Sequence, residues 1–139
     1  MSWSYGRRSL SRLATCHEDL QTLMVAALDH PECPCDITIV EGHRAEARQN
    51  QMVAEGKSRL RWPRSRHNST PSMAVDIAPY VDGTVSWSWD WFTPLGVHIK
   101  TVWAELQSAG RVTPRHKLTW GADWTGGFRD GPHFQIDYV

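Results

Sequence analysis

The sequence lacks an excess of charge of either sign, and it lacks a long apolar run. Its 139 residues contain fifteen Lys and Arg and fifteen Asp and Glu, so the formal net charge is zero. Nucleic-acid-binding domains are usually basic, and a neutral balance argues against that class. No apolar stretch approaches the roughly 18 residues typical of a transmembrane helix, and arginines interrupt the N-terminal region where a signal peptide needs an apolar core. We therefore expect no nucleic-acid partner, no membrane insertion and no signal peptide.

Cysteine is also scarce. The chain has three cysteines, Cys16, Cys33 and Cys35. An odd number, with two of them only two positions apart, does not indicate a disulfide framework. We expect free thiols and folding in a reducing compartment. A metal site built from Cys33, Cys35 and His30 is the weaker alternative, because no second cysteine pair completes a four-ligand set.

What the chain has in quantity is tryptophan, with eight residues. Large rings in apolar segments usually fill a core, and we expect this for five or six of them. One or two are expected to line a groove, since a flat amphipathic ring suits a peptide or sugar surface. The length, together with the lack of repeats or low-complexity segments, predicts a single domain over residues 1–139.

Periodic patterns predict helices separated by short strands. Apolar residues at helical spacing predict helices over 10–30, 46–55 and 91–109, and β-branched or alternating runs predict strands over 36–40, 73–80, 118–120 and 134–138. Asp82-Gly83 is a turn signal that indicates a hairpin. Together these elements predict an α+β fold, with helices packed on one face of a small antiparallel sheet.

Two imidazoles and one carboxylate form a candidate zinc site. They are His67 in a polar loop, Asp76 in a predicted strand, and His133 at the start of the last strand. A catalytic zinc takes three protein ligands and keeps a fourth position for water. His67 considered alone would more ordinarily be an exposed loop histidine. Asp76 has the stronger case, because a carboxylate between apolar strand residues is seldom buried without a partner.

Three further side chains are candidates for the chemistry. Asp130 precedes His133 in Asp130-Gly131-Pro132-His133, where a turn could place its carboxylate beside the water as proton acceptor. Arg44 follows a predicted strand and could bind a substrate carboxylate or an oxyanion. Ser65 could hydrogen-bond a substrate carbonyl. Their ordinary interpretations are a turn aspartate, a surface arginine paired with an acidic neighbour, and a solvated serine.

Several segments, in order along nearly the whole chain, carry a resemblance to a known family. They are 38–44, Ser65-Arg66-His67, 71–80, 120–124 and 130–134. The pattern resembles phage endolysins of the L-alanyl-D-glutamate endopeptidase type, which belong to the zinc peptidases related to D-alanyl-D-alanine carboxypeptidases. The resemblance implies a zinc peptidase fold of the D-Ala-D-Ala carboxypeptidase and hedgehog type.

The resemblance also implies residue roles and a biological setting. His67, Asp76 and His133 would hold a single zinc ion, Asp130 would be the catalytic base, and Arg44 and Ser65 would bind substrate or stabilise the oxyanion. The substrate would be the stem peptide of bacterial peptidoglycan, cut at the L-Ala–D-Glu bond to lyse the host. We expect a monomer without a separate wall-binding domain. It would accumulate in the host bacterial cytoplasm and depend on a separate membrane-pore protein to reach the cell wall.

The chain departs from the family pattern in two places. A longer spacer, residues 68–72, stands where a glycine often lies between the first histidine and the aspartate. Gln135 stands where glutamate is common, which would keep a hydrogen bond to a ligand and remove a negative charge.

Two functions besides the endopeptidase stay open. A D-alanyl-D-alanine carboxypeptidase or dipeptidase that trims peptidoglycan precursors would use the same metal chemistry, with a closed cleft and a second cation. A non-catalytic wall-binding module would hold a structural metal with four protein ligands. His43 or His116 would be the candidates for the fourth ligand.

Overall fold

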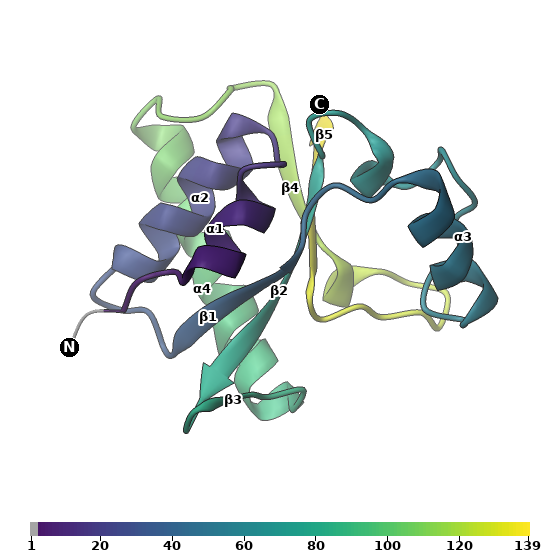
Figure 1. The fold of residues 1–139 in the computed structure, drawn as a ribbon. Coiled ribbons are helices and arrows are strands. Elements are labelled where there is room, and N and C mark those ends of the chain that lie inside the picture. Colours follow the sequence, from purple (N-terminus) through teal and green to yellow (C-terminus); the bar gives the residue numbers. More distant parts are fainter. Residues whose placement is uncertain (1–2) are drawn as a thin grey trace.

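A computed structural model describes residues 3–139, and it shows an antiparallel sheet with helices on both sides (Figure 1). The helices are α1 (Arg7–Leu13), α2 (Glu18–Asp29), α3 (Glu46–Ala54) and α4 (Trp89–Ser108). The strands are β1 (Asp36–Glu41), β2 (Ala74–Val81), β3 (Thr84–Val85), β4 (His116–Trp120) and β5 (His133–Tyr138). Two short 3-10 helices, η1 (Arg66–Asn68) and η2 (Gly121–Asp123), complete the described elements. The predicted α+β class and all four predicted strands are confirmed.

The helix predicted over 10–30 is wrong in one respect, because the structure divides it into α1 and α2. The division lies at Cys16, which forms an isolated parallel bridge with Ser72. His17 then caps α2, with its Nδ1 accepting the backbone N–H of Asp19 at 2.9 Å. Helical spacing continues through the break, so the periodicity could not reveal a contact with a residue far along the chain.

The sheet order β1-β2-β5-β4 places the last strand at the centre, with β3 pairing with β2 at its far end. In the β2–β5 ladder, Asp76 lies opposite His133. On the other side of β2, Asp76 is opposite Glu41, beside an irregularity in the β1 register. Antiparallel partners bring their side chains within reach of each other, so the register itself brings two of the predicted ligands together.

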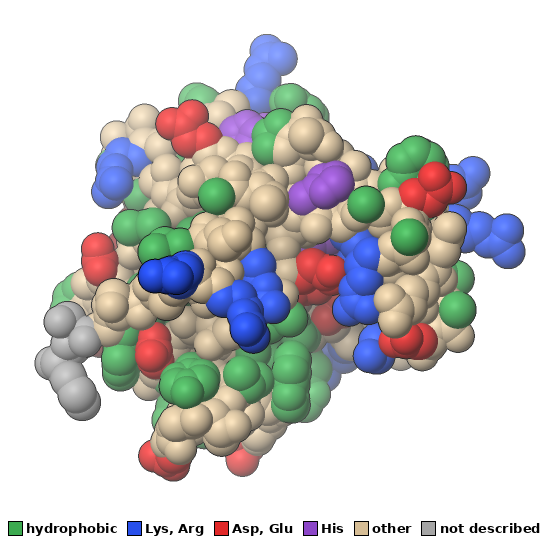
Figure 2. Space-filling view, in the orientation of Figure 1, with side chains coloured by type: hydrophobic (Ala, Val, Ile, Leu, Met, Phe, Trp, Pro, Cys, Tyr) green, Lys and Arg blue, Asp and Glu red, His purple; other side chains and the backbone are tan. Residues whose placement is uncertain are grey.

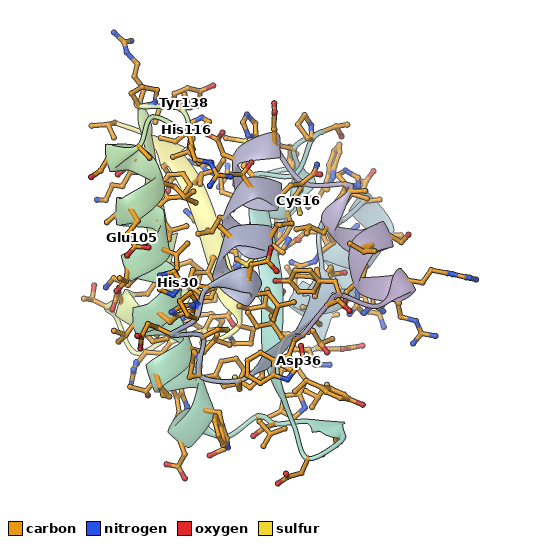
Figure 3. The ribbon with its side chains drawn as sticks, turned by 90° about the vertical axis from the view of Figure 1, so that its left-hand side faces the viewer. Cys16, His30, Asp36, Glu105, His116 and Tyr138 are labelled. Atoms are coloured by element: carbon orange, nitrogen blue, oxygen red, sulfur yellow. The ribbon has the colours of Figure 1, made fainter. Side chains whose placement is uncertain are left out.

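The main core lies between the sheet and one layer of helices. Figures 1 and 3 show α1, α2 and α4 on one side of the strands, with α2 and α4 side by side and His30 beside Glu105 where they meet. The prediction of helices on one face holds for these three. Helix α3 lies on the opposite side, next to the candidate site (Figure 1). Among residues 3–139, no helix has the length and hydropathy needed to cross a bilayer.

Helix α4 approaches the sheet closely at Gly96. A Cβ atom at this position would overlap the indole ring of Trp120 on β4. The Trp120 ring in turn stacks on Phe134 of β5, with ring centroids 5.9 Å apart and planes 2° from parallel. Gly96 therefore allows the ring of Trp120 to fill the space between α4 and β5.

Fewer tryptophans belong to the core than predicted. Trp103 and Trp120 are buried, and Trp3 and Trp91 pack against the core while partly buried. Trp62, Trp87 and Trp89 are exposed. The prediction that one or two would line a groove is confirmed by Trp87 and Trp124, which line the cleft at the candidate site.

Candidate metal centre and active site

The side chains of His67, Asp76 and His133 converge on one point. The three facing atoms are His67 Nε2, Asp76 Oδ1 and His133 Nδ1, and their separations are 3.2, 3.3 and 3.3 Å. Two ligand atoms of a tetrahedral zinc, each about 2.0–2.1 Å from the ion, lie about 3.3 Å apart. The triangle therefore has the dimensions of three corners of a zinc tetrahedron.

Hydrogen bonds on the outer side of each ring hold the two histidines in an orientation suited to metal binding. His67 Nδ1 donates to the carbonyl oxygen of Gly42 at 2.7 Å. His133 Nε2 donates to Gln135 Oε1, also at 2.7 Å. An imidazole that keeps its proton on this outer nitrogen can present the lone pair of its inner nitrogen, Nε2 of His67 or Nδ1 of His133, to a metal ion at the shared point.

Gln135 is itself held in the orientation that His133 needs. Its amide nitrogen donates to Asp137 Oδ2 at 2.9 Å, and Asp137 Oδ1 accepts from Arg66 Nε at 2.6 Å. An amide whose nitrogen faces a carboxylate must turn its oxygen toward the imidazole. Gln135, which stands where glutamate is common in the family, therefore keeps a hydrogen bond to His133. A negative charge is still present beyond it, on the carboxylate of Asp137.

The first candidate ligand, His67, is positioned by a capped turn. Ser65 Oγ accepts the backbone N–H of His67 at 3.2 Å, and Asn68 Oδ1 accepts the backbone N–H of Ser65 at 3.1 Å. This reciprocal pair is a capping box, which fixes the start of η1. Ser65 is buried and also borders the cleft. Its contact with substrate stays a prediction, and the structure adds a role for its hydroxyl at the turn.

Arg44 lies behind Asp76, the candidate carboxylate ligand. Its side chain is 4 % exposed, and its NH2 group donates to Glu41 Oε1 at 2.7 Å and to Asp76 Oδ2 at 3.3 Å. Its NH1 group donates to Gln49 Oε1 at 2.9 Å. The guanidinium thus holds one oxygen of Asp76 and leaves the other, Oδ1, facing the two imidazoles. The expected pairing with an acidic neighbour is present in the contact with Glu41, but the arginine is buried instead of lying on the surface.

The two aspartates at the site have opposite electrostatic environments. Burial would raise the pKa of Asp76, but the adjacent imidazoles of His67 and His133 outweigh it and hold this pKa far below its ordinary value. For Asp130, burial and the charge of Asp76 raise the pKa from 3.8 to about 6. Two carboxylates whose pKa values are driven apart are typical of a division of roles, one as an anionic ligand and the other as a proton carrier.

These groups lie in a cleft between the α3 side of the molecule and the loop before β5. The cleft is bordered by His67, Asp76 and His133 at its base, and by Arg44, Ser65 and Asp130. Figure 2 shows acidic and basic side chains next to one another in the hollow beside the α3 part of the surface. The structure thus gathers all six residues predicted from the sequence around one cleft.

The sequence predicted that one or two tryptophans line a groove, but it did not identify which ones or indicate Phe128 beside them. The ring of Trp124 packs on His133 with centroids 4.9 Å apart, and Phe128 lies 6.1 Å beyond Trp124. Both residues come from the irregular segment before β5, where no periodicity exists. The signal in the sequence was the amphipathic ring of tryptophan, which suits a surface that binds a ligand.

A second cluster, formed by His17, Asp19 and His116, is held by hydrogen bonds. His116 Nδ1 donates to Asp19 Oδ2 at 2.6 Å, which is shorter than the edge of a zinc tetrahedron. Asp19 also accepts the backbone N–H of Thr113 at 3.0 Å. Burial alone would raise the pKa of Asp19, but these hydrogen bonds lower it. The hydrogen bond between Asp19 and His116 connects α2 to the start of β4. His116 does not border the cleft that contains His67, Asp76 and His133.

Neither His43 nor the residues around Cys33 and Cys35 form a metal site among residues 3–139. His43 lies 3.3 Å from the hydroxyl of Thr70 and is not in the ligand cluster. His30 contacts Glu105, while the Cys33 thiol donates to the carbonyl of Cys35. Burial raises the pKa of the Cys35 thiol to about 12, so it stays protonated at neutral pH. The three cysteines are free, as predicted.

Comparison with known proteins gives concordant matches. A family model described as phage L-alanyl-D-glutamate peptidase matches residues 1–136. The L-alanyl-D-glutamate peptidase of Escherichia phage T5 is 33% identical over 149 residues, which cover 98% of this chain and 99% of that protein. The crystal structure of the Serratia marcescens L-Ala D-Glu endopeptidase ChiX superposes with a TM-score of 0.75 at 31% identity, covering 96% of this chain and 90% of the other.

Proposed function

The chain belongs to the phage L-alanyl-D-glutamate peptidase family, and from this premise we propose that it is a zinc-dependent endopeptidase. It acts on bacterial peptidoglycan and hydrolyses the L-Ala–D-Glu bond of the stem peptide. The phage T5 and Serratia relatives are both L-Ala–D-Glu peptidases, and their similarity to this chain extends over nearly its full length.

The observation that carries the metal assignment is the triangle formed by His67, Asp76 and His133. Its edges of 3.2–3.3 Å fit zinc, and the outer hydrogen bonds hold both rings with their inner nitrogens toward the shared point. Three ligands and a side open to the cleft are typical of a catalytic site, whereas a structural zinc has four protein ligands. A zinc ion supplies, when bound, Lewis-acid polarisation of a substrate carbonyl and activation of water.

The protein groups handle protons and hold the substrate. Asp130 accepts a proton from the attacking water and passes it to the nitrogen of the leaving D-glutamyl amine as the C–N bond breaks. In the metal-free protein, burial and the charge of Asp76 raise the pKa of Asp130 to about 6, and its place beside the cleft allows it to take and release this proton. Arg44 fixes Asp76 and borders the cleft, where its remaining N–H can bond the substrate oxygen that gains charge.

The biological setting follows from the endolysin assignment. We propose that the protein accumulates in the host bacterial cytoplasm as a monomer, and that a separate membrane-pore protein admits it to the cell wall. Its partner there is peptidoglycan, recognised through the cleft.

Digestion of purified peptidoglycan tests the proposal directly. Mass spectrometry of the released fragments should show new C-terminal L-alanine and new N-terminal D-glutamate. A chelator should stop the release, and added zinc should restore it. Release of terminal D-alanine alone would instead identify a trimming carboxypeptidase. Stoichiometric zinc binding without any release would identify a non-catalytic wall-binding module.

A further inference from the structure

The cleft contains more cations than carboxylates. Three acidic residues border it, namely Glu41, Asp76 and Asp130. Six basic residues border it, namely Arg44, Arg48, Lys57, Arg59, Arg66 and Arg129. In a protein of zero formal net charge, the charged side chains that border this cleft are therefore predominantly basic. Such a cleft favours an anionic ligand.

Four of the six cations are already paired with carboxylates. Arg44 pairs with Glu41 and Asp76, Arg48 with Glu41, Lys57 with Glu55, and Arg66 with Asp137. Within residues 3–139, Arg59 and Arg129 are the two cleft cations that have no carboxylate within 4.0 Å. Their charges are therefore available to a ligand.

Both unpaired guanidinium groups are held against aromatic rings. Arg59 lies over the ring of Phe128, with 4.7 Å from its Cζ to the ring centroid. Arg129 lies over Trp89 at 4.5 Å, and its Nε donates to the carbonyl of Ala122 at 3.0 Å. A guanidinium stacked by its face keeps its N–H edge free for a planar carboxylate, and stacking reduces the rotamer freedom lost on binding.

The two arginines are connected to the ligand site by the chain and by the aromatic wall. Arg129 directly precedes Asp130. Arg59 comes from the segment after α3 and reaches Phe128, which lies next to Trp124, which in turn packs on His133. The guanidinium groups therefore border the same cleft as the triangle of ligand atoms.

We propose that Arg59 and Arg129 bind the free carboxylate of the glutamyl residue whose amine lies in the scissile bond. This inference rests on the proposed L-Ala–D-Glu specificity. A glutamyl residue has two carboxyl groups, and a linear stem peptide continues through only one of them. The other is close to the bond that is cut, and it distinguishes this residue from neutral ones. Recognition of this charge makes the positive cleft a determinant of substrate choice.

Two synthetic peptides that differ only at this carboxylate provide the test. One contains L-Ala joined to D-Glu with its α-carboxylate free and continued through the γ-carboxyl group, and the other is the α-carboxamide. Hydrolysis of both is measured with the zinc-loaded wild-type protein and with the double variant R59Q/R129Q. The matched control is K57Q/K117Q, which removes the same number of positive charges as R59Q/R129Q. Lys57 borders the cleft but pairs with Glu55, and Lys117 is exposed on β4.

The wild type and the control should prefer the acid by roughly tenfold or more in kcat/KM, because a hydrogen bond to a charged group is strong. The double variant R59Q/R129Q should lose this preference and cleave the amide about as well as the wild type does. Equal hydrolysis of acid and amide by the wild type would overturn the proposal. An equal loss on both peptides in R59Q/R129Q would also overturn it, because that result indicates a merely structural role.

Failure of the proposed function would look different, since neither peptide would then be cut at its L-Ala–D-Glu bond. Calorimetric binding of the uncleaved peptides still tests the arginines in that case. Tighter binding of the acid that disappears in R59Q/R129Q supports the carboxylate site, and equal affinities refute it.

Discussion

Replacing Asp130 with asparagine should stabilise the metal-free protein while removing most of its activity. The carboxyl group of Asp130 makes no hydrogen bond within residues 3–139, and its local geometry is fixed by the backbone. Its N–H donates to Gly121 at 3.1 Å, and its carbonyl accepts from His133 at 3.3 Å. Asparagine has nearly the same shape, so these backbone contacts and the three ligands should persist.

The expected gain in stability follows from the pKa of Asp130. Burial and the charge of Asp76 raise it from 3.8 to about 6, so ionising this group in the folded state costs up to about 3 kcal/mol more than in the unfolded chain. Because the folded-state pKa is the higher one, the protonated group contributes stability below pH 4, and this contribution is lost as the pH rises through about 6. Asparagine carries no charge at any pH and avoids that loss.

Thermal unfolding in the presence of a chelator measures this effect. At pH 8 the Tm of D130N should exceed that of the wild type by roughly 5–10 °C, and the difference should shrink toward zero near pH 4. With zinc restored, hydrolysis should fall about 10²–10⁴-fold, the usual contribution of a general base. A D130N protein with near wild-type activity, or one no more stable than the wild type at pH 8, would refute the reasoning.

Three further substitutions test the metal site and the packing behind it. His67→Ala should abolish stoichiometric zinc binding in equilibrium dialysis, since it removes one corner of the triangle; retained one-to-one binding would contradict the ligand assignment. Gln135→Leu removes the acceptor for His133 Nε2 and should weaken zinc binding about 10–100-fold in a chelator competition; an unchanged affinity would show that this hydrogen bond is dispensable. Gly96→Ala places a methyl group against the ring of Trp120 and should cost about 1–3 kcal/mol in urea unfolding, whereas an unshifted midpoint would mean that α4 moves away freely.

The loss of folding stability caused by ionising Asp130 in the folded protein is consistent with a functional site. A buried carboxylate near another carboxylate is unfavourable for folding, and asparagine would remove the penalty. Proteins retain such groups where activity needs them. The pattern therefore agrees with the role proposed for Asp130, and it explains why one substitution should raise stability and lower activity together.

Local patterns in the sequence were sufficient for most elements. Strands such as β1 and β2 are dense in β-branched and apolar residues bounded by turn signals, and α4 carries a long apolar stripe. The same patterns missed η1 and η2, which are too short to show a period. They also failed to separate α1 from α2, because the break depends on Ser72 meeting Cys16.

The sequence alone determined which residues could form the site. Histidine and aspartate are side chains that bind zinc, and the ordered resemblance over nearly the whole chain selected His67, Asp76 and His133 from among the seven histidines and the acidic residues. Only the tertiary structure decided how they meet. The pairing of β2 with β5 sets Asp76 opposite His133, and the capped turn at Ser65 brings in His67.

The tertiary structure also decided the surroundings of that site. Arg44 holds Asp76 from behind, Gln135 is oriented by Asp137, and Arg59 contacts Phe128. None of these contacts follows from spacing, because each joins side chains whose distance depends on strand register and loop conformation. The sequence specifies the type of each side chain, whereas the distances between residues remote in the sequence are set only when the sheet forms.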